Sequence, residues 1–413
     1  MATRVLMLVT ELAMGGAAKV VRELSAMLAT RFEVHEAVFN VADGVDFDGI
    51  ATPYSLNVSG GGSVLNKLAN LRRRIRRTRA LKRKLRIDVS ISHLEGAHWV
   101  DVLSRRGEKV VLCVHGSTLN NGEIRGLSGW LRAQVVLPLI YNRADRIVTV
   151  SHGIRSELIS LGVRAERIST IHNSFDLPGI AERSREPLSR AEDGLFGSAP
   201  VLVTVGRLAP PKNQAALLDI FAEVLAQRPA KLLILGDGEL RATLIERAVT
   251  LGLRVCSGWN GRAPTPDADV YFLGVRSNPF NLVSRSDLFL MTSSWEGFPL
   301  ALCEAMACGT PVLCTDCFTG PREILSPDTP MPAEAITAAE WTNRGVLLPV
   351  LNDPGSYVQA RSVWAQTILR LLAEPAARER LTMGAQARVQ DFGREEKAGE
   401  WADLIDQLAT GRR

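Results

Sequence analysis

Short apolar segments alternate with helix-like stretches through the first half of the chain. Five segments have the length and composition of buried strands: RVLMLV at 4–9, VSISHL at 89–94, KVVLCVHG at 109–116, DRIVTVS at 145–151 and RISTIHN at 167–173. A helix is expected after the first of them, from about Ala17. Apolar strands separated by helices are typical of a parallel sheet that helices cover on both faces.

The same pattern begins again near residue 200. Its apolar segments are PVLVTVGRL at 200–208, KLLILGDG at 231–238, VYFLG at 270–274, DLFLMTS at 287–293 and TPVLCTD at 310–316. Helices are expected from about Asn213 and Pro299, and a polar stretch at 178–199 without periodicity is interpreted as a linker. The sequence therefore predicts an α/β protein of two Rossmann-like domains, 1–178 and 179–395. The closing segment 396–413 is expected to form a helix that packs back on the first domain.

Length and composition are consistent with this organisation. The chain has 413 residues, 46% of them hydrophobic and 23% charged, which suits two soluble domains. No apolar run approaches the length of a membrane span, and RVLMLVT is interpreted as a strand rather than a signal peptide. The expected location is the cytoplasm, where the six cysteines stay reduced.

Positive charge is concentrated in residues 67–86, which contain 11 Lys and Arg and no acid. Outside this strip the chain carries 38 basic and 44 acidic residues, so a nucleic-acid partner is not expected. As a helix, the strip would pack through an apolar line, Leu68, Leu71, Ile75, Leu81 and Leu85. Its cations favour an anionic membrane surface, reached from the cytoplasm by charge rather than insertion.

The most informative stretch is SWEGFPLALCEAMACG at 294–309. Pro299 suits the first turn of a helix, and Gly309 suits its C-terminal end. The free N–H groups of such a helix start, after Gly297, would favour a phosphate. Glu296 and Glu304 would lie near the same helix mouth. A carboxylate tolerates a nearby phosphate when it accepts hydrogen bonds from sugar hydroxyls, so the pattern favours a sugar nucleotide.

With this context, the chain resembles the retaining glycosyltransferases of family 4, whose hallmark is a Glu-x7-Glu motif on the GT-B fold. The resemblance also rests on Val205-Gly206-Arg207-Leu208, Leu235-Gly236-Asp237-Gly238, Phe272-Leu273-Gly274 and Gly320-Pro321-Arg322-Glu323. In the first half it reaches Met14-Gly15-Gly16 and Val114-His115-Gly116. It implies two facing Rossmann-like domains and a place in bacterial polysaccharide or lipopolysaccharide biosynthesis.

The resemblance assigns roles residue by residue. It implies that Glu296 contacts the donor sugar, Glu304 the ribose, and Arg207 and Lys212 the diphosphate. His115 would approach the sugar from the other domain. The remaining donor-binding positions are Gly16, Gly206, Val275, Gly297, Phe298, Pro299 and Leu300. Two cations can replace a metal at the leaving diphosphate, so no metal and no cofactor is expected.

The expected activity is transfer of a sugar from a nucleoside-diphosphate sugar to a glycan or lipid-linked glycan. Three other functions remain open: a sugar-nucleotide epimerase, a non-catalytic sugar-nucleotide-binding subunit, and a nicotinamide oxidoreductase, which the missing GxGxxG disfavours. His93 and His98 are interpreted as structural. The triplets Asp46-Phe-Asp48 and Asp267-Ala-Asp269 imitate a metal-binding pattern, and we interpret both as chance.

Overall fold

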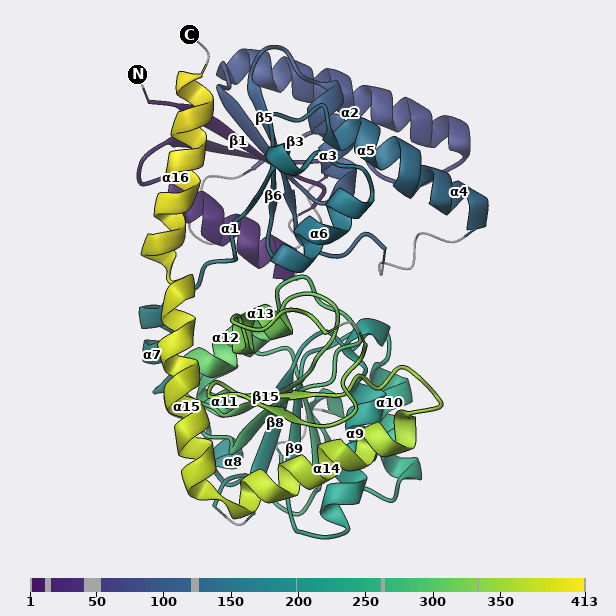
Figure 1. The fold of residues 1–413 in the computed structure, drawn as a ribbon, viewed down its shortest axis with the longest axis vertical. Helices are drawn as coiled ribbons and strands as arrows, with labels where there is room; N and C mark the ends of the chain where they lie inside the picture. The colour runs from purple at the N-terminus through teal and green to yellow at the C-terminus, as the bar shows by residue number, and fades with distance from the viewer. Residues whose placement is uncertain are drawn as a thin grey trace. The chain divides into compact units, whose positions relative to one another are not determined.

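The computed structural model describes residues 2–11, 16–40, 53–119, 126–197, 199–260, 264–332 and 334–411. Two compact units make up the chain (Figure 1). The first comprises Met1–Phe175 together with Arg394–Arg413, and the second comprises Asp176–Gly393.

The first unit is a parallel sheet covered by helices. In the described part its strand order is β3-β2-β1-β4-β5-β6-β7, and every neighbouring pair is parallel. The strands are β1 (Arg4–Val9), β2 (Glu33–Val38), β3 (Tyr54–Ser55), β4 (Val89–His93), β5 (Lys109–Val114), β6 (Arg146–Thr149) and β7 (Ile168–Thr170). The helices are α1 (Gly16–Leu28), α2 (Val64–Leu85), α3 (Glu95–Leu103), α4 (Gly126–Leu131), α5 (Leu137–Tyr141) and α6 (His152–Ser160), with a π-helical turn at Arg132–Val136 between α4 and α5. The order reverses between β1 and β4, and ligands of such sheets bind beyond the carboxyl ends of the strands at this point.

The C-terminal helix α16 (Arg394–Thr410) belongs to the first unit. Arg394 pairs with Glu23 of α1 at 2.6 Å, and Asp406 pairs with Arg31 at 2.6 Å. Two of its own side chains, Trp401 and Ile405, are buried. Because these contacts tie both ends of α16 to the α1 segment, the chain returns to the unit in which it began, as Figure 1 shows.

The second unit repeats the architecture with a larger sheet. Its described strands lie in the order β10-β11-β9-β8-β12-β13-β15-β14, with β14–β15 as the antiparallel pair. The strands are β8 (Val201–Val205), β9 (Lys231–Leu235), β10 (Val255–Ser257), β11 (Val270–Gly274), β12 (Leu288–Met291), β13 (Val312–Thr315), β14 (Glu340–Trp341) and β15 (Val346–Leu348). The helices are α7 (Leu177–Ser184), α8 (Arg190–Asp193), α9 (Gln214–Leu225), α10 (Arg241–Thr250), α11 (Phe280–Val283), α12 (Leu300–Ala307), α13 (Pro321–Leu325), α14 (Tyr357–Ala373) and α15 (Pro375–Val389). Here the order reverses between β8 and β12.

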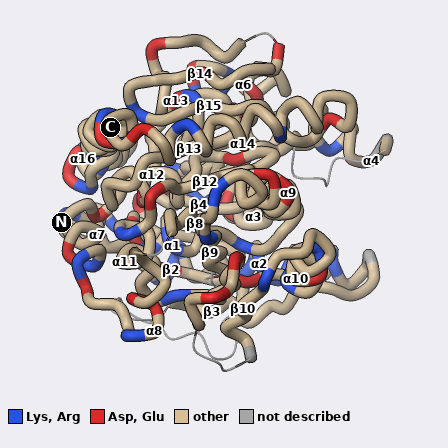
Figure 2. Tube along the Cα trace, turned by 90° about the horizontal axis from the view of Figure 1, so that it is seen from below, with Lys and Arg blue, Asp and Glu red and all other residues tan. Residues whose placement is uncertain are grey.

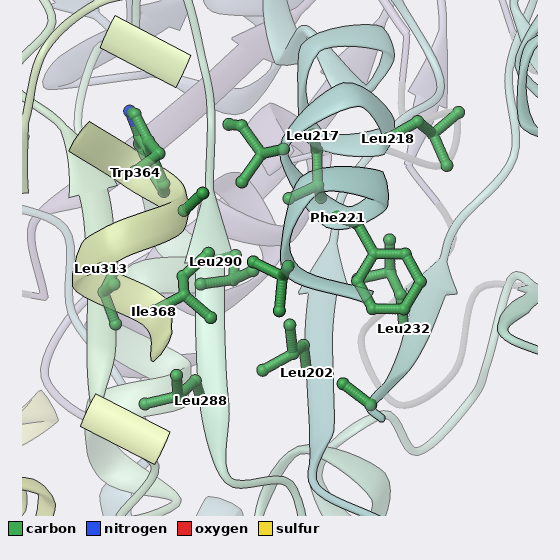
Figure 3. Close-up of a cluster of buried hydrophobic side chains, with 14 of the residues drawn as sticks. Leu202, Leu217, Leu218, Phe221, Leu232, Leu288, Leu290, Leu313, Trp364 and Ile368 are labelled. Carbon is green, nitrogen blue, oxygen red and sulfur yellow. The ribbon is translucent and has the colours of Figure 1, made fainter. Parts of the chain in front are cut away.

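The core of the second unit forms where helices α9 and α14 pack on the sheet. Figure 3 shows Phe221 of α9 and Trp364 of α14 among leucines of the strands. Trp364 has no exposed surface, and its indole nitrogen donates to the carbonyl of Pro349 at 3.0 Å. This packing fixes β8 and β12, and so the loops that follow them.

The stretch expected to be an irregular linker contains two helices. Helix α7 begins at the N-cap Asp176 and buries Ile180, while α8 begins with a capping box formed by Ser189 and Glu192. The interpretation of 178–199 as irregular was therefore wrong, because caps rather than apolar periodicity define these short helices.

The basic strip forms helix α2, but its packed side differs from the expected line. Leu71, Leu81 and Leu85 pack on the core, whereas Leu68 is 52% exposed. Lys82 is buried and forms ion pairs with Asp101 at 2.6 Å and Glu108 at 2.7 Å. The expectation that Leu68 belongs to the packed line was therefore wrong, and one of the eleven cations, Lys82, faces the interior of the unit. In the described residues, no helix is long and apolar enough to cross a membrane.

Candidate active site

The loops that follow β8 and β9 cross each other backbone to backbone. A Cβ atom on Gly236 would lie 2.0 Å from the carbonyl oxygen of Gly206, and one on Gly238 would lie 2.4 Å from that of Leu208. Gly236 also has a φ of +133°, which side chains rarely adopt. The glycines of LGDG therefore position the loop that carries Gly206 and Arg207.

Lys212 lies at the end of a 3-10 turn, Pro210–Lys212, just before α9. Thr292, after β12, donates its hydroxyl to the carbonyls of Lys212 and Asn213 at 3.2 and 3.1 Å. The Lys212 ammonium lies 2.6 Å from Oε1 of Glu296. The ends of the two strands at the sheet reversal are thus joined through a charged pair.

Glu296 is held from both sides. Its Oε1 also accepts a hydrogen bond from the Ser293 hydroxyl at 2.6 Å, and its backbone carbonyl accepts one from Thr319. Gly320, with φ of +87°, lies so close to this segment that a Cβ there would approach Cδ of Pro299 to 2.5 Å. The Gly320-Pro321 segment therefore packs closely against the 296–299 loop and fixes it at the start of α12.

A small hollow, partly open to solvent, lies at this point. The residues around it include Thr204, Val205, Lys212, Gln214, Met291, Thr292, Ser293, Glu296, Pro299, Leu300 and Ala301. Helix α12 starts here with Pro299 at its N-cap, which provides no side-chain hydrogen bond. The start of α12 therefore has the chemistry that favours an anion, with a cation, Lys212, beside it.

Not all predicted site residues meet in this hollow. Lys212, Glu296, Pro299 and Leu300 line it, and Phe298 is buried in the loop that leads to it. Glu304 is 9% exposed, one turn further along α12.

Two other predicted donor contacts lie at the surface. Arg207 is exposed and pairs with Glu239 at 2.9 Å, and Val275, after β11, is 57% exposed. The role of Glu239 has no counterpart in the sequence prediction, because a carboxylate three residues beyond Gly236 carries no signal of its own.

His115 belongs to the first unit and follows β5. Its Nε2 lies 2.8 Å from Nδ1 of His93, the last residue of β4. Glu157 of α6 accepts hydrogen bonds from the Ser117 hydroxyl and, at 2.6 Å, from the Thr118 amide, and so fixes the loop after His115. Burial lowers the pKa of His115 to about 4, which keeps its ring neutral near pH 7. Gly16 is the first residue of α1, and Met14 and Gly15 lie outside the described residues.

Burial accounts for three of the cysteines, and an ion pair accounts for Asp269. Burial raises the pKa of Cys303, Cys314 and Cys317, which makes them poor nucleophiles near neutral pH. Asp269 binds Arg254, with Oδ1 at 2.5 Å from the guanidinium. Asp46 and Asp48 lie outside the described residues.

Comparison with known proteins shows to which family the chain belongs. The family model described as "Glycosyltransferase Family 4" matches residues 14–177. The family model described as "Glycosyl transferases group 1" matches residues 186–330. An uncharacterized glycosyltransferase of Methanocaldococcus jannaschii is 30% identical over 302 residues, which span 70% of each chain. The chain is a family 4 glycosyltransferase.

Other relatives of this glycosyltransferase agree with the assignment. An N-acetylgalactosamine-N,N'-diacetylbacillosaminyl-diphospho-undecaprenol 4-alpha-N-acetylgalactosaminyltransferase of Campylobacter jejuni is 25% identical over 317 residues, 76% of this chain and 81% of that one. Among solved structures, a sucrose-phosphate synthase from Thermosynechococcus elongatus aligns with a TM-score of 0.75 at 19% identity over 99% and 100% of the two chains. Anabaena HepE with UDP-glucose aligns with a TM-score of 0.71 at 20% identity over 98% and 99%. The predicted GT-B class of two α/β domains is confirmed.

Proposed function

We propose that this glycosyltransferase moves a sugar from a nucleoside-diphosphate sugar to a hydroxyl of a glycan or lipid-linked glycan, with retention of configuration and without a metal ion. The observation that carries the proposal is the Lys212–Glu296 pair at the uncapped start of α12. It offers an anion-binding position and a hydroxyl-binding carboxylate side by side.

The donor's diphosphate is assigned to the start of α12. The N–H groups of a helix start favour an anion, and Lys212 adds a full positive charge. Among the described residues, Lys212 and Ser293 both bond to Oε1 of Glu296, which leaves Oε2 for a sugar hydroxyl. Glu304 is assigned to the ribose, and the exposed Val275 backbone to the base.

Lys212 and Arg207 would stabilise the charge that develops on the departing diphosphate, which is electrostatic catalysis in place of a metal. Each cation already has a carboxylate partner, Glu296 and Glu239 respectively. The diphosphate would compete with Glu239 for Arg207. Breaking this exposed ion pair costs little free energy. With retention, the acceptor attacks on the face that the diphosphate leaves, and a phosphate oxygen can take its proton.

The activities for which relatives are named support a choice of substrates. The Campylobacter jejuni relative is named for a diphospho-undecaprenol acceptor, and one from Escherichia coli is a lipopolysaccharide 1,6-galactosyltransferase. Anabaena HepE was solved with UDP-glucose. We therefore infer a UDP-sugar donor and a lipid-linked or lipopolysaccharide acceptor in polysaccharide biosynthesis. Neither an epimerase nor a non-catalytic subunit has a specific observation in its favour.

Incubation with UDP-, GDP- and ADP-sugars plus a lipid-linked glycan acceptor, followed by mass spectrometry, tests the function. A product heavier than the acceptor by one sugar residue is expected, and NMR of the new linkage reports retention. Donor turnover without an acceptor would instead indicate an epimerase. Binding of a donor without transfer to any acceptor would indicate a non-catalytic subunit.

The leaving-group assignment is tested by substitution. Lys212→Ala and Arg207→Ala should each lower kcat by about a hundredfold or more, because each removes a preorganised charge. EDTA should leave the rate unchanged. Glu239→Gln is the matched control, since it frees Arg207 and should retain activity. Loss of activity in EDTA with rescue by Mn²⁺, or an unaffected Arg207→Ala enzyme, contradicts this mechanism.

We also propose that α2 attaches the enzyme to an anionic membrane surface, at the cytoplasmic face. Figure 2 marks the basic residues of α2 in blue. The exposed cations of this helix include Lys67, Arg72, Arg76, Arg83 and Lys84. The exposed Leu65 and Leu68 at the start of the helix add apolar contact to the attraction by charge.

A further inference from the structure

The two histidines at the sheet reversal of the first unit form an in-plane hydrogen bond. His93 ends β4 and His115 follows β5, and Nδ1 of one lies 2.8 Å from Nε2 of the other. Their ring centroids are 5.1 Å apart with 24° between the planes. The nitrogens are 2.8 Å apart and the centroids 5.1 Å, and these two distances agree only if each nitrogen lies close to the line between the centroids, so the contact runs along the ring planes. One ring therefore donates and the other accepts.

The second ring nitrogen of His93 identifies the donor. His93 has no exposed surface, and its Nε2 finds no hydrogen-bond partner in the described structure. Its neighbours in register on β1 and β5 are Val9 and Cys113, whose side chains provide no oxygen. A buried N–H without an acceptor is rarely tolerated. The proton of His93 is therefore better placed on Nδ1, where His115 accepts it.

Burial disfavours the charged form of both rings. Burial lowers the pKa of His93 well below its usual range, and the neighbouring His115 and His98 lower it further. Burial also lowers the pKa of His115. The pair is neutral near pH 7, with one proton in the shared bond and one left on the outer nitrogen of His115.

We propose that His93 is a positioning residue that holds His115 as its Nδ1–H tautomer, so that His115 presents an N–H donor at the half-buried surface of the first unit. The Glu157 carboxylate fixes the loop that directly follows His115. Resting on the proposed function, the sugar group that meets His115 is then a hydrogen-bond acceptor, such as a hydroxyl oxygen lone pair. A site that offered a bare nitrogen would instead select a donor.

A metal site is the competing interpretation, since Cys113 lies beside the pair and could offer a third ligand. The ring nitrogens of the pair point directly at each other at hydrogen-bond distance, where an ion between them would force them apart. Burial also raises the pKa of the Cys113 thiol, which opposes the thiolate that a metal requires. The hydrogen-bonded pair accounts for the geometry without an ion.

The tautomer can be read directly by NMR. Two-bond ¹⁵N–¹H correlation spectra of the full chain distinguish Nδ1–H from Nε2–H in each of the 6 histidines, and His115→Gln assigns the His115 signals. His115 should be the Nδ1–H tautomer in the native chain and in His93→Asn, because the Asn amide nitrogen occupies nearly the position of Nδ1. His93→Leu should lose the preference.

Kinetics provide a second measurement. His93→Leu should lower kcat/KM for the donor about tenfold, the effect of one lost hydrogen bond, whereas His93→Asn should remain close to the native enzyme. His98→Phe is the control for loss of a buried histidine, because His98 bonds to Ser92 at 3.0 Å and not to His115. It should destabilise the chain while leaving the His115 tautomer unchanged.

Three results would overturn the proposal: an Nε2–H tautomer at His115 in the native chain, equal loss of activity in His93→Asn and His93→Leu, or stoichiometric zinc whose removal alters the His115 signals. The spectra do not depend on catalysis. If the native chain transfers no sugar but shows the Nδ1–H tautomer, the proposed function fails and the positioning role of His93 stands.

Discussion

At the scale of single residues, the two glycines where the loops cross differ in how much room each has for a side chain. A Cβ on Gly236 would overlap the Gly206 carbonyl oxygen, whereas one on Gly206 would meet nothing nearer than Cδ of Lys212 at 3.8 Å. Gly236→Ala should therefore cost about 2–4 kcal/mol of unfolding free energy, from steric overlap together with a positive φ. Denaturant unfolding measures this difference.

Gly206→Ala is the matched variant. Its unfolding free energy should change by less than about 1 kcal/mol, because the added methyl group makes only ordinary contacts. If Gly206 is a donor-binding position, as the resemblance implies, the KM for the donor should rise while stability stays unchanged. A Gly236→Ala protein as stable as the native one would show that the loops separate easily, and would weaken the argument that LGDG positions Arg207.

At the scale of elements, α2 carries two kinds of cation. Arg74 stacks on Phe39 at 4.3 Å, and Arg79 donates to the carbonyl of Leu103 at 2.8 Å, so both fasten the helix to its unit. Lys82 also holds α2 to the unit, through buried ion pairs with Asp101 and Glu108. Lys82→Met should cost about 3–5 kcal/mol of unfolding free energy, because it leaves Asp101 and Glu108 as buried charges without a counter-ion. Calorimetry of the purified variant checks this value.

The outward cations of α2 should behave in the opposite way. Replacing Arg72, Arg76 and Arg83 together by Glu should leave stability almost unchanged but weaken binding to anionic vesicles at low salt by about a hundredfold or more, at roughly 1 kcal/mol for each cation. Co-sedimentation measures the binding. Salt-insensitive binding to neutral vesicles, or no binding to anionic ones, would contradict attachment by charge and favour a soluble acceptor.

Sequence reasoning succeeded for elements with strong apolar patterns and failed for short, capped or polar ones. The apolar runs became β1, β4, β5 and the core strands of the second unit. In contrast, β2 reads EVHEAV and β14 has two residues, so neither carries a pattern that distinguishes it from a loop. Long-range partners are equally invisible, because nothing in the sequence places Glu239 beside Arg207 or His93 beside His115.

At the scale of the whole molecule, acid should destabilise the chain through histidines that are neutral when folded. Burial lowers the pKa of His98 to about 3 and that of His115 to about 4, while an unfolded histidine titrates near 6.5. Below about pH 6.5 the unfolded chain therefore binds protons that the folded chain does not, and stability falls as pH falls. Each such histidine removes about 1.4 kcal/mol per pH unit until its folded pKa is reached.

The buried histidines and the carboxyls change the stability of the chain in different pH ranges. The pKa of Glu108, which burial would raise, is lowered overall by Lys82, so its contribution is lost only as pH falls below about 4.5. Burial raises the pKa of Glu36, which opposes the histidines by favouring the folded state in acid. Calorimetric scans between about pH 6.5 and pH 4.5 should show a steep loss of stability, and His98→Phe should flatten the slope by one histidine. An identical slope in His98→Phe would mean that His98 takes up its proton in the folded chain, and that the pocket formed by Ser92 and Tyr141 opens to water before the unit unfolds.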